Sequence, residues 1–177
     1  MATFLILQQI LKTGIVSEPA PEADPALRTR EQALHADILK VFGQAVAIRH
    51  VDAGSCNGCE LEIHALNGPH YNIDGMGVKF AASPRHVDVL LVTGPVSRNM
   101  EVALKRAYDA TPEPKWVVAM GECACSGGMF GESYASCGKV SNVIPVDVEV
   151  PGCPPTPAAL LQGILAAVSK GRTDAES

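Results

Sequence analysis

The sequence predicts an α/β domain built on a doubly wound, mainly parallel, flavodoxin-like sheet. Apolar, β-branched runs alternate with segments of helical spacing along most of the 177 residues, and this alternation is typical of parallel sheets. Residues 87–93 (VDVLLVT) and 116–120 (WVVAM) are nearly continuous apolar runs, as expected of strands that are buried on both faces. A chain of this length can bury a substantial core as a single domain.

The expected elements follow one another along the chain. Strands are predicted at 45–51, 78–82, 87–93, 116–120 and 143–150, and helices at 27–42, 60–66, 100–110 and 157–168. The last helix should begin with Thr156 as its cap and with a proline at its first position, where the missing N–H has no intrahelical partner to lose.

Residues 1–26 are predicted to form an extended N-terminal arm with a proline-rich linker, and residues 27–177 to form the folded domain. Residues 3–15 have the spacing of a short amphipathic helix, whereas three prolines within 17–25 exclude a continuous helix or strand there. The arm is either a frayed tail or a docking element for a partner or a membrane face, because length and amphipathicity alone do not decide between them.

Composition narrows the class of function. A net charge of -5 and an aromatic content of 5% argue against a nucleic-acid partner. No apolar run is long enough to span a bilayer, and the first residues lack the basic flank and cleavage site of a signal peptide, so we expect a cytoplasmic protein. In that compartment the six cysteines are expected to bind metal or take part in catalysis rather than to form disulfides.

Four of these cysteines lie in turns rich in glycine or proline, each directly after a predicted strand. In chain order they are Cys56 and Cys59, Cys123, and Cys153. Because ligands of open α/β sheets bind beyond the carboxyl ends of the strands, the three turns are expected to converge at one edge. Thiolates gathered in this way suit an iron–sulfur cluster.

Two other kinds of site remain open at this point. Four thiolates can hold structural zinc, although zinc sites usually pair two short Cys-x-x-Cys turns and this chain has one. A redox dithiol at Cys56 and Cys59 is also possible, but it leaves Cys123 and Cys153 unexplained. Cys125 competes with Cys123 as a ligand; otherwise Cys125 and Cys137 are expected to be small buried hydrophobic residues or free thiols.

Five longer motifs carry a family resemblance. They are GSCNGCELEI (54–63), SPRHVDVLLVTG (83–94), YDATPEP (108–114), GECACSGGMF (121–130) and IPVDVEVPGCPPTP (144–157). With them the chain resembles, over about residues 45–168, the 20 kDa subunit family of respiratory complex I. It is most similar to the small subunits of membrane-bound, energy-converting nickel–iron hydrogenases such as formate hydrogenlyase. Complex I homologues carry adjacent cysteines in the first motif, whereas Asn57 and Gly58 separate them here, as in the hydrogenase-like branch.

The resemblance implies one 4Fe–4S cluster held by Cys56, Cys59, Cys123 and Cys153. The family pattern Gly-x-Cys-x-x-x-Gly-Gly selects Cys123 over Cys125. Glu62 matches the acidic residue that follows the first cysteine pair, so it either tunes the cluster or relays protons, or else it is an exposed helix carboxylate. His50, His64 and His86 are expected to be ordinary histidines, either hydrogen-bonded within the protein or exposed to solvent. A redox-linked proton role for any of them is the less expected interpretation.

The implied function is that of an electron-transfer subunit of an oxidoreductase complex, not catalytic alone. It would relay electrons between a ferredoxin-like iron–sulfur subunit and the large catalytic subunit of a hydrogenase, beside membrane subunits, as a peripheral protein on the cytoplasmic side of the inner membrane. The alternative is the cluster subunit of a complex I-like quinone oxidoreductase module with a 49 kDa-like partner. A rival of a different class is a zinc-stabilised assembly protein without redox function.

Overall fold

The computed structural model describes residues 11–12 and 45–175, with side chains described as far as residue 169. The elements below all belong to the unit Glu31–Ser177. Its strands are β1 (Val46–Asp52), β2 (Val78–Phe80), β3 (Val89–Thr93), β4 (Trp116–Met120) and β5 (Val148–Val150). Its α-helices are α3 (Gly58–Leu66), α4 (Arg98–Ala110), α5 (Glu122–Ser126) and α6 (Pro157–Ala175), and its 3-10 turns are η1 (Ile73–Met76), η2 (Pro84–His86) and η3 (Val140–Asn142).

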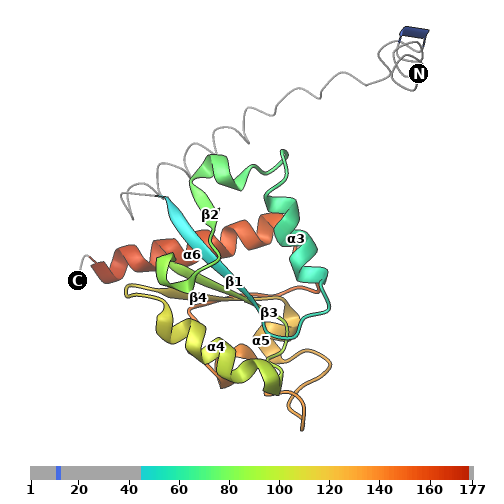
Figure 1. Ribbon diagram of the computed structural model, residues 1–177, viewed down its shortest axis with the longest axis vertical. Helices are drawn as coiled ribbons and strands as arrows, with labels where there is room; N and C mark the ends of the chain where they lie inside the picture. Colours follow the sequence, from blue (N-terminus) through green and yellow to red (C-terminus); the bar gives the residue numbers. More distant parts are fainter. Residues whose placement is uncertain (1–10, 13–44, 176–177) are drawn as a thin grey trace, which may run out of the picture. The chain divides into compact units, whose positions relative to one another are not determined.

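The five strands form one sheet in the order β2-β1-β3-β4-β5 (Figure 1), and every pair is parallel. This is the flavodoxin-like order, in which the chain switches direction across the sheet between β1 and β3. The register aligns Asp52 with Thr93, and Thr93 with Met120. The carboxyl ends of the three central strands therefore finish at the same edge, as the sequence predicts.

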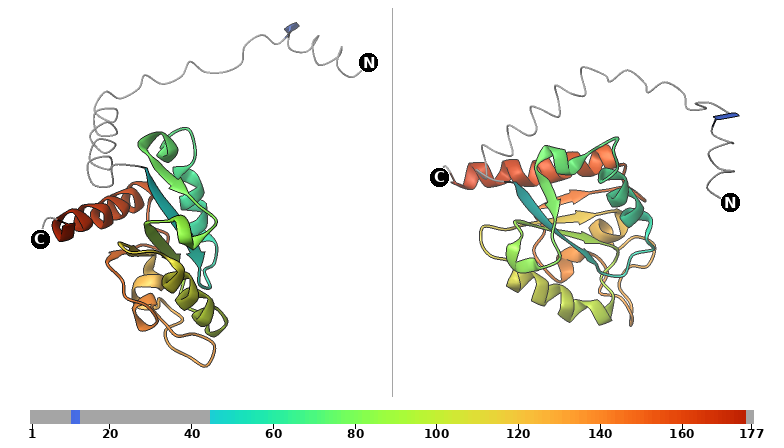
Figure 2. Two further views of the ribbon diagram at one scale, coloured as in Figure 1. Left: turned by 60° about the vertical axis from the view of Figure 1, so that its left-hand side comes forward. Right: turned by 45° about the horizontal axis from the view of Figure 1, so that its top comes forward.

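Helices cover both faces of the sheet (Figure 2). One buried cluster joins α3 and α6 to the sheet through residues such as Leu66 and Leu160, and a second joins α4 and α5 through Leu104 and Ala124. All five residues of β3 and all five of β4 are buried, because central strands of a parallel sheet have helices on both sides. None of the helices in the described part of the chain is long and apolar enough to cross a membrane.

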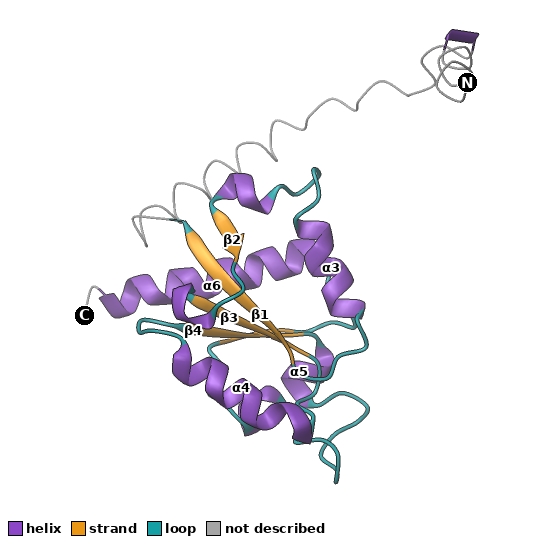
Figure 3. Ribbon diagram, viewed as in Figure 1, coloured by secondary structure: helices purple, strands orange, loops and turns teal. Residues whose placement is uncertain are grey.

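Local signals explain where the elements begin. The backbone N–H of Ala159 donates to Thr156 Oγ1 at 3.2 Å, and Pro157 is the first residue of α6, which confirms the predicted cap and proline. The helix continues to Ala175, beyond the predicted end at 168. Loops that follow the strands gather at one end of the sheet, where α3 and α5 begin (Figure 3).

The structure differs from the sequence prediction in two places. The predicted strand at 143–150 is only Val148–Val150, after the turn η3, since Pro145 cannot donate to a strand neighbour. The residues after β4 form the short helix α5 rather than a simple turn. The predicted arm and linker (1–26) and the predicted helix at 27–42 lie outside the described residues, apart from Leu11 and Lys12, which are helical.

Candidate cluster site

The cysteines of the first motif lie between β1 and the first turn of α3. Asn57 adopts a left-handed conformation (φ 72°) as the residue before the helix, and this reverses the chain so that Cys56 precedes α3 and Cys59 lies within it. Asp52, the last residue of β1, accepts hydrogen bonds from the backbone N–H groups of Gly54 and Ser55 at 2.9 and 2.8 Å. The turn that carries Cys56 is thus fixed to the end of its strand.

Contacts between the loops bring the remaining cysteines to the same edge. Cys59 Sγ lies 4.0 Å from the carbonyl oxygen of Met120, the last residue of β4. The backbone N–H of Glu122, beside Cys123, donates to the carbonyl oxygen of Gly152, beside Cys153, at 2.7 Å. The turns after β1, β4 and β5 therefore meet, as the strand order requires.

Burial and neighbouring charges raise the pKa values of two of these thiols. The pKa of Cys59 is raised to about 12, first by burial, then by the charge of Glu60, and then by the charges of Cys56, Cys123 and Cys153. The pKa of Cys123 is raised by burial and, next, by the charges of Cys153 and Cys56. All four are free thiols; Cys56 and Cys153 are exposed, whereas Cys59 and Cys123 are partly buried.

Glycines leave space directly beside two of these sulfurs. A Cβ atom placed on Gly121 would lie 2.7 Å from Cys59 Sγ, and one on Gly128 would lie 2.8 Å from Cys123 Sγ. Both distances are too short for any real side chain, and both glycines have positive φ angles of 93° and 55°, which favour glycine. The Cys59 and Cys123 sulfurs therefore lie directly against glycine backbone, in space that any other residue would fill, and thiols placed in this way on neighbouring loops fit an iron–sulfur cluster.

A single zinc ion would need a different arrangement of ligands from an iron–sulfur cluster. Among the described residues, no group of three or more His, Cys, Asp or Glu side chains is placed to hold one metal ion. A mononuclear zinc site needs sulfur ligands about 2.3 Å from a common point. Such a zinc site is not preformed by the thiols in this structure.

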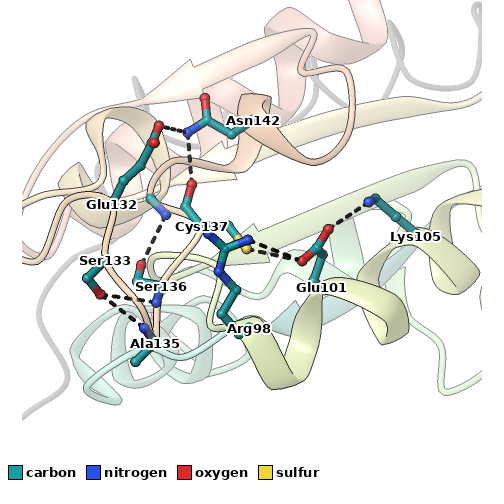
Figure 4. Close-up of polar contacts among 10 residues, drawn as sticks. Arg98, Glu101, Lys105, Glu132, Ser133, Ala135, Ser136, Cys137 and Asn142 are labelled. Carbon is teal, nitrogen blue, oxygen red and sulfur yellow. Dashed lines mark hydrogen bonds and ion pairs between the residues drawn. The ribbon is translucent and has the colours of Figure 1, made fainter.

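The other two cysteines have separate surroundings. Cys125 packs against the core on the α4–α5 side of the sheet and its thiol donates to the carbonyl oxygen of Ala119 at 3.5 Å. Burial, followed by the charge of Glu149, raises its pKa to about 11. Cys137 is buried, and its thiol donates to Glu101 Oε2 at 3.4 Å (Figure 4). Both thiols have protein partners of their own, in line with the expected small buried residues.

Figure 4 also shows how the segment after α5 is held. Asn142 donates from Nδ2 to Glu132 Oε1 at 2.6 Å and to the carbonyl oxygen of Cys137 at 2.8 Å. Arg98 and Lys105 form ion pairs with Glu101 on α4. Arg98, at the start of α4, thus pairs with a neighbour on its own helix.

The acidic residue with the most structured surroundings is Glu60, not Glu62. Glu62 is half-buried on α3, whereas Glu60 is buried with an exposure of 9%. The hydroxyls of Ser55 and Thr93 donate to Glu60 Oε2 and Oε1, each at 2.5 Å. Sequence reasoning missed Glu60, although Thr93 offered a signal: a hydroxyl at the end of an otherwise apolar, buried strand requires a polar partner.

His50 joins this cluster from β1. Its Nε2 lies 2.9 Å from Thr93 Oγ1 and 3.5 Å from Glu60 Oε1. Burial lowers the pKa of His50 below its usual 6.5, against the opposing charges of Glu60 and Asp52. The other two histidines considered from the sequence, His64 and His86, are exposed.

Large apolar side chains are exposed on α3 and on the segment after α5. They are Leu61, Met129, Phe130 and Tyr134, with exposures of 61%, 91%, 61% and 99%. Leu61 lies two residues after Cys59, and Met129 directly follows Gly128. Exposed apolar side chains of this size, close in the chain to the cysteine motifs, are candidates for contact with another molecule.

Comparison with known sequences identifies one family. The family described as NADH ubiquinone oxidoreductase, 20 Kd subunit, matches residues 56–167. A Pyrococcus furiosus protein named "Probable membrane-bound hydrogenase subunit mbhJ" is 45% identical over 143 residues, covering 81% of this chain and 86% of that protein. Formate hydrogenlyase subunit 7 of Escherichia coli is 43% identical over 136 residues, covering 77% of this chain but only 53% of that protein.

Solved structures share the fold. A chain of the membrane-bound sulfane sulfur reductase, an archaeal respiratory membrane complex, has a TM-score of 0.65 and 29% identity, covering 77% of this chain and 76% of that one. A chain of an NAD+-reducing NiFe hydrogenase has a TM-score of 0.56 and 18% identity, covering 69% and 92%, which shows the fold alone. The resemblance read from the sequence motifs is confirmed: the chain belongs to the NADH ubiquinone oxidoreductase 20 kDa subunit family and is similar to subunits of membrane-bound hydrogenase complexes.

Proposed function

We propose that this chain is an electron-transfer subunit that holds one 4Fe–4S cluster through Cys56, Cys59, Cys123 and Cys153. The observation that carries the proposal is that the three loops which contain these cysteines meet at the carboxyl edge of the sheet. When bound, such a cluster supplies reversible one-electron exchange, with a potential set by burial, charge and hydrogen bonds to sulfur. The family and its hydrogenase relatives support an iron–sulfur role.

The protein contributes ligands, their spacing and the surroundings. Gly121 and Gly128 leave room for the sulfurs of Cys59 and Cys123, which a side chain at either position would displace. Cys59 lies in the first turn of α3, where the helix dipole opposes the rise in its pKa that burial causes. The exposed thiols would keep one side of the cluster close to the surface, where electrons enter and leave.

The exposed apolar side chains next to the cysteine motifs in the chain, Leu61, Met129 and Phe130, support docking of larger partners. We infer a large hydrogenase-like catalytic subunit as the electron acceptor, a ferredoxin-like iron–sulfur subunit as the donor, and membrane subunits that keep the complex at the cytoplasmic side of the inner membrane. The relatives whose names include a membrane-bound hydrogenase and formate hydrogenlyase support this assignment. The two residues between Cys56 and Cys59 favour the hydrogenase-like branch.

A second candidate is the cluster subunit of a complex I-like quinone oxidoreductase module. The family description, which refers to NADH ubiquinone oxidoreductase, favours it. The two candidates differ in the large partner, since only a hydrogenase partner holds nickel. Metal analysis of the complex purified from its native host distinguishes them: stoichiometric nickel supports the hydrogenase, and its absence from an intact, active complex supports the quinone-reducing module.

Anaerobic purification of the full chain tests the cluster itself. We expect a brown protein with broad visible absorption, about four irons and four sulfides per chain, and an electron paramagnetic resonance signal on reduction. A colourless protein with stoichiometric zinc would instead support the zinc-stabilised assembly protein. That result would overturn the proposed function.

A further inference from the structure

The carboxylate of Glu60 is held from two sides by hydroxyls of separate elements. Ser55 belongs to the turn that carries Cys56, and Thr93 is the last residue of β3. Each donates to a different oxygen of Glu60 at 2.5 Å, so both carboxylate oxygens have a hydroxyl partner. Glu60 therefore lies at the switch point between β1 and β3, where this fold places its ligands.

The hydrogen bonds around Glu60 suit an ionised carboxylate. A hydroxyl has one proton, so a Thr93 hydroxyl that donates to Glu60 is free to accept from His50 Nε2–H, which lies 2.9 Å away. Ser55 likewise accepts from the backbone N–H of Asn57 at 3.0 Å while it donates to Glu60. Both carboxylate oxygens can therefore accept from a hydroxyl whose own lone pair is used elsewhere.

Burial makes this charge effective at short range. Glu60 is only 9% exposed, so water screens it much less than it would a surface carboxylate. It directly follows Cys59 in the chain, and its hydrogen-bond partner Ser55 directly precedes Cys56, so the carboxylate lies between the two cysteines of the first motif and the end of β3. A buried carboxylate is costly, and the hydrogen bonds from Ser55 and Thr93 offset part of this cost.

We propose that Glu60 is a fixed negative charge that lowers the reduction potential of the cluster, and that Ser55 and Thr93 are the positioning residues that hold it. The inference rests on the proposed function, because it requires a cluster on Cys59. Adding an electron beside a buried negative charge is unfavourable, so the charge favours the oxidised cluster. Glu60 would make this subunit a stronger reductant than the same cysteine set without it.

The test is a redox titration of the full chain, loaded with its cluster under anaerobic conditions and followed by electron paramagnetic resonance. Glu60→Gln, which removes the charge but keeps the size, should shift the midpoint potential to more positive values with unchanged iron content. Glu113→Gln is the matched control, because Glu113 precedes β4 at the opposite end of the sheet and its side chain is 74% exposed. We expect the control to titrate like the wild type. Equal potentials for Glu60→Gln and wild type would overturn the inference.

Two further comparisons keep the test decisive. If Glu60→Gln does not take up the cluster, the comparison is made between Glu60→Asp and Glu60→Asn, which differ from each other in charge but hardly in size. Equal midpoint potentials for these two variants would also overturn the inference. Thr93→Val should shift the potential, whereas Thr93→Ser, which keeps the hydroxyl, should restore it; a Thr93→Val protein with the wild-type potential would refute the positioning role. A wild-type chain that holds no cluster would instead overturn the proposed function.

Discussion

Adding one methyl group at Gly128 tests whether the shape of the backbone around Cys123 matters for cluster binding. Gly128 and Gly131 have nearly the same left-handed backbone, with φ angles of 55° and 52°, but their surroundings differ. A Cβ on Gly128 would lie 2.8 Å from Cys123 Sγ, whereas a Cβ on Gly131 would have no atom within 4 Å. Alanine at either position costs about 1–2 kcal/mol for the left-handed conformation. The two variants therefore differ in the contact of the added methyl group with Cys123, at its Sγ and, at 3.2 Å, at its Cα.

The size of the displacement follows from the distances. Ordinary contact begins at 3.4 Å, so the 2.8 Å approach requires the Cys123 sulfur or the backbone to move by about 0.6 Å. Binding groups must be held to within about 0.5 Å of their productive positions. We therefore expect Gly128→Ala to lose most of its cluster and Gly131→Ala to keep it, although both should be less stable to urea by a similar amount.

Iron and sulfide content per chain, measured after anaerobic reconstitution, reports the cluster, and urea unfolding of the cluster-free proteins reports the backbone cost. The comparison is informative because any loss of iron through instability alone would appear in both variants. If Gly128→Ala retained as much iron as Gly131→Ala, Cys123 would not depend on this cradle, and its assignment as a ligand would be in doubt.

Three further outcomes are expected. Cys153→Ser should remove or convert the cluster. Cys137→Ser changes a thiol that is hydrogen-bonded to Glu101 on α4, and it should leave the electron paramagnetic resonance signal nearly intact. Similar losses of signal in both variants would contradict the ligand assignment. Because the folded-state pKa of His50 is below 6.5, the unfolded chain binds more protons than the folded chain near and below that pH. The free energy of unfolding should therefore fall as the pH is lowered from about 7 to about 5. His50→Gln should reduce this fall when stability is measured by urea titration at each pH. Leu104→Ala, at a fully buried position, should cost about 2–5 kcal/mol of unfolding free energy, whereas Val102→Ala, at a position that is 55% exposed, should cost much less; equal costs would show that α4 packs by another face.

The sequence was sufficient for the features that depend on long patterns. The uninterrupted apolar runs that became β3 and β4 have few alternatives to a buried parallel strand, and the turns after them had to meet at one edge once the strands were parallel. The helix α5 could not be predicted in this way. It has only five residues between Gly121 and Gly127, too few for a helical period to be visible in the sequence.

The choice between Glu60 and Glu62 shows a second limit. Both are glutamates on α3, and which of them faces the sheet depends on the rotation of the helix about its axis. That rotation is fixed by where the helix starts, after the left-handed Asn57, and by the hydroxyl of Thr93, which lies on a strand 33 positions away. Neither the start of the helix nor the contact with Thr93 can be read from the spacing of residues along the chain.

The fold also explains why a cluster and a buried charge can share one edge of the sheet. At the switch point the neighbouring connections leave in opposite directions, so that the carboxyl end of β1 and that of β3 are not covered by the same helix. This opening admits the side chain of Glu60 from α3 to the end of β3, while Gly121, at the end of β4, leaves room for the Cys59 sulfur. A carboxylate further along α3 would lie nearer to solvent and be screened. The same topology that gathers the thiols therefore also provides the site from which a single charge can act on them.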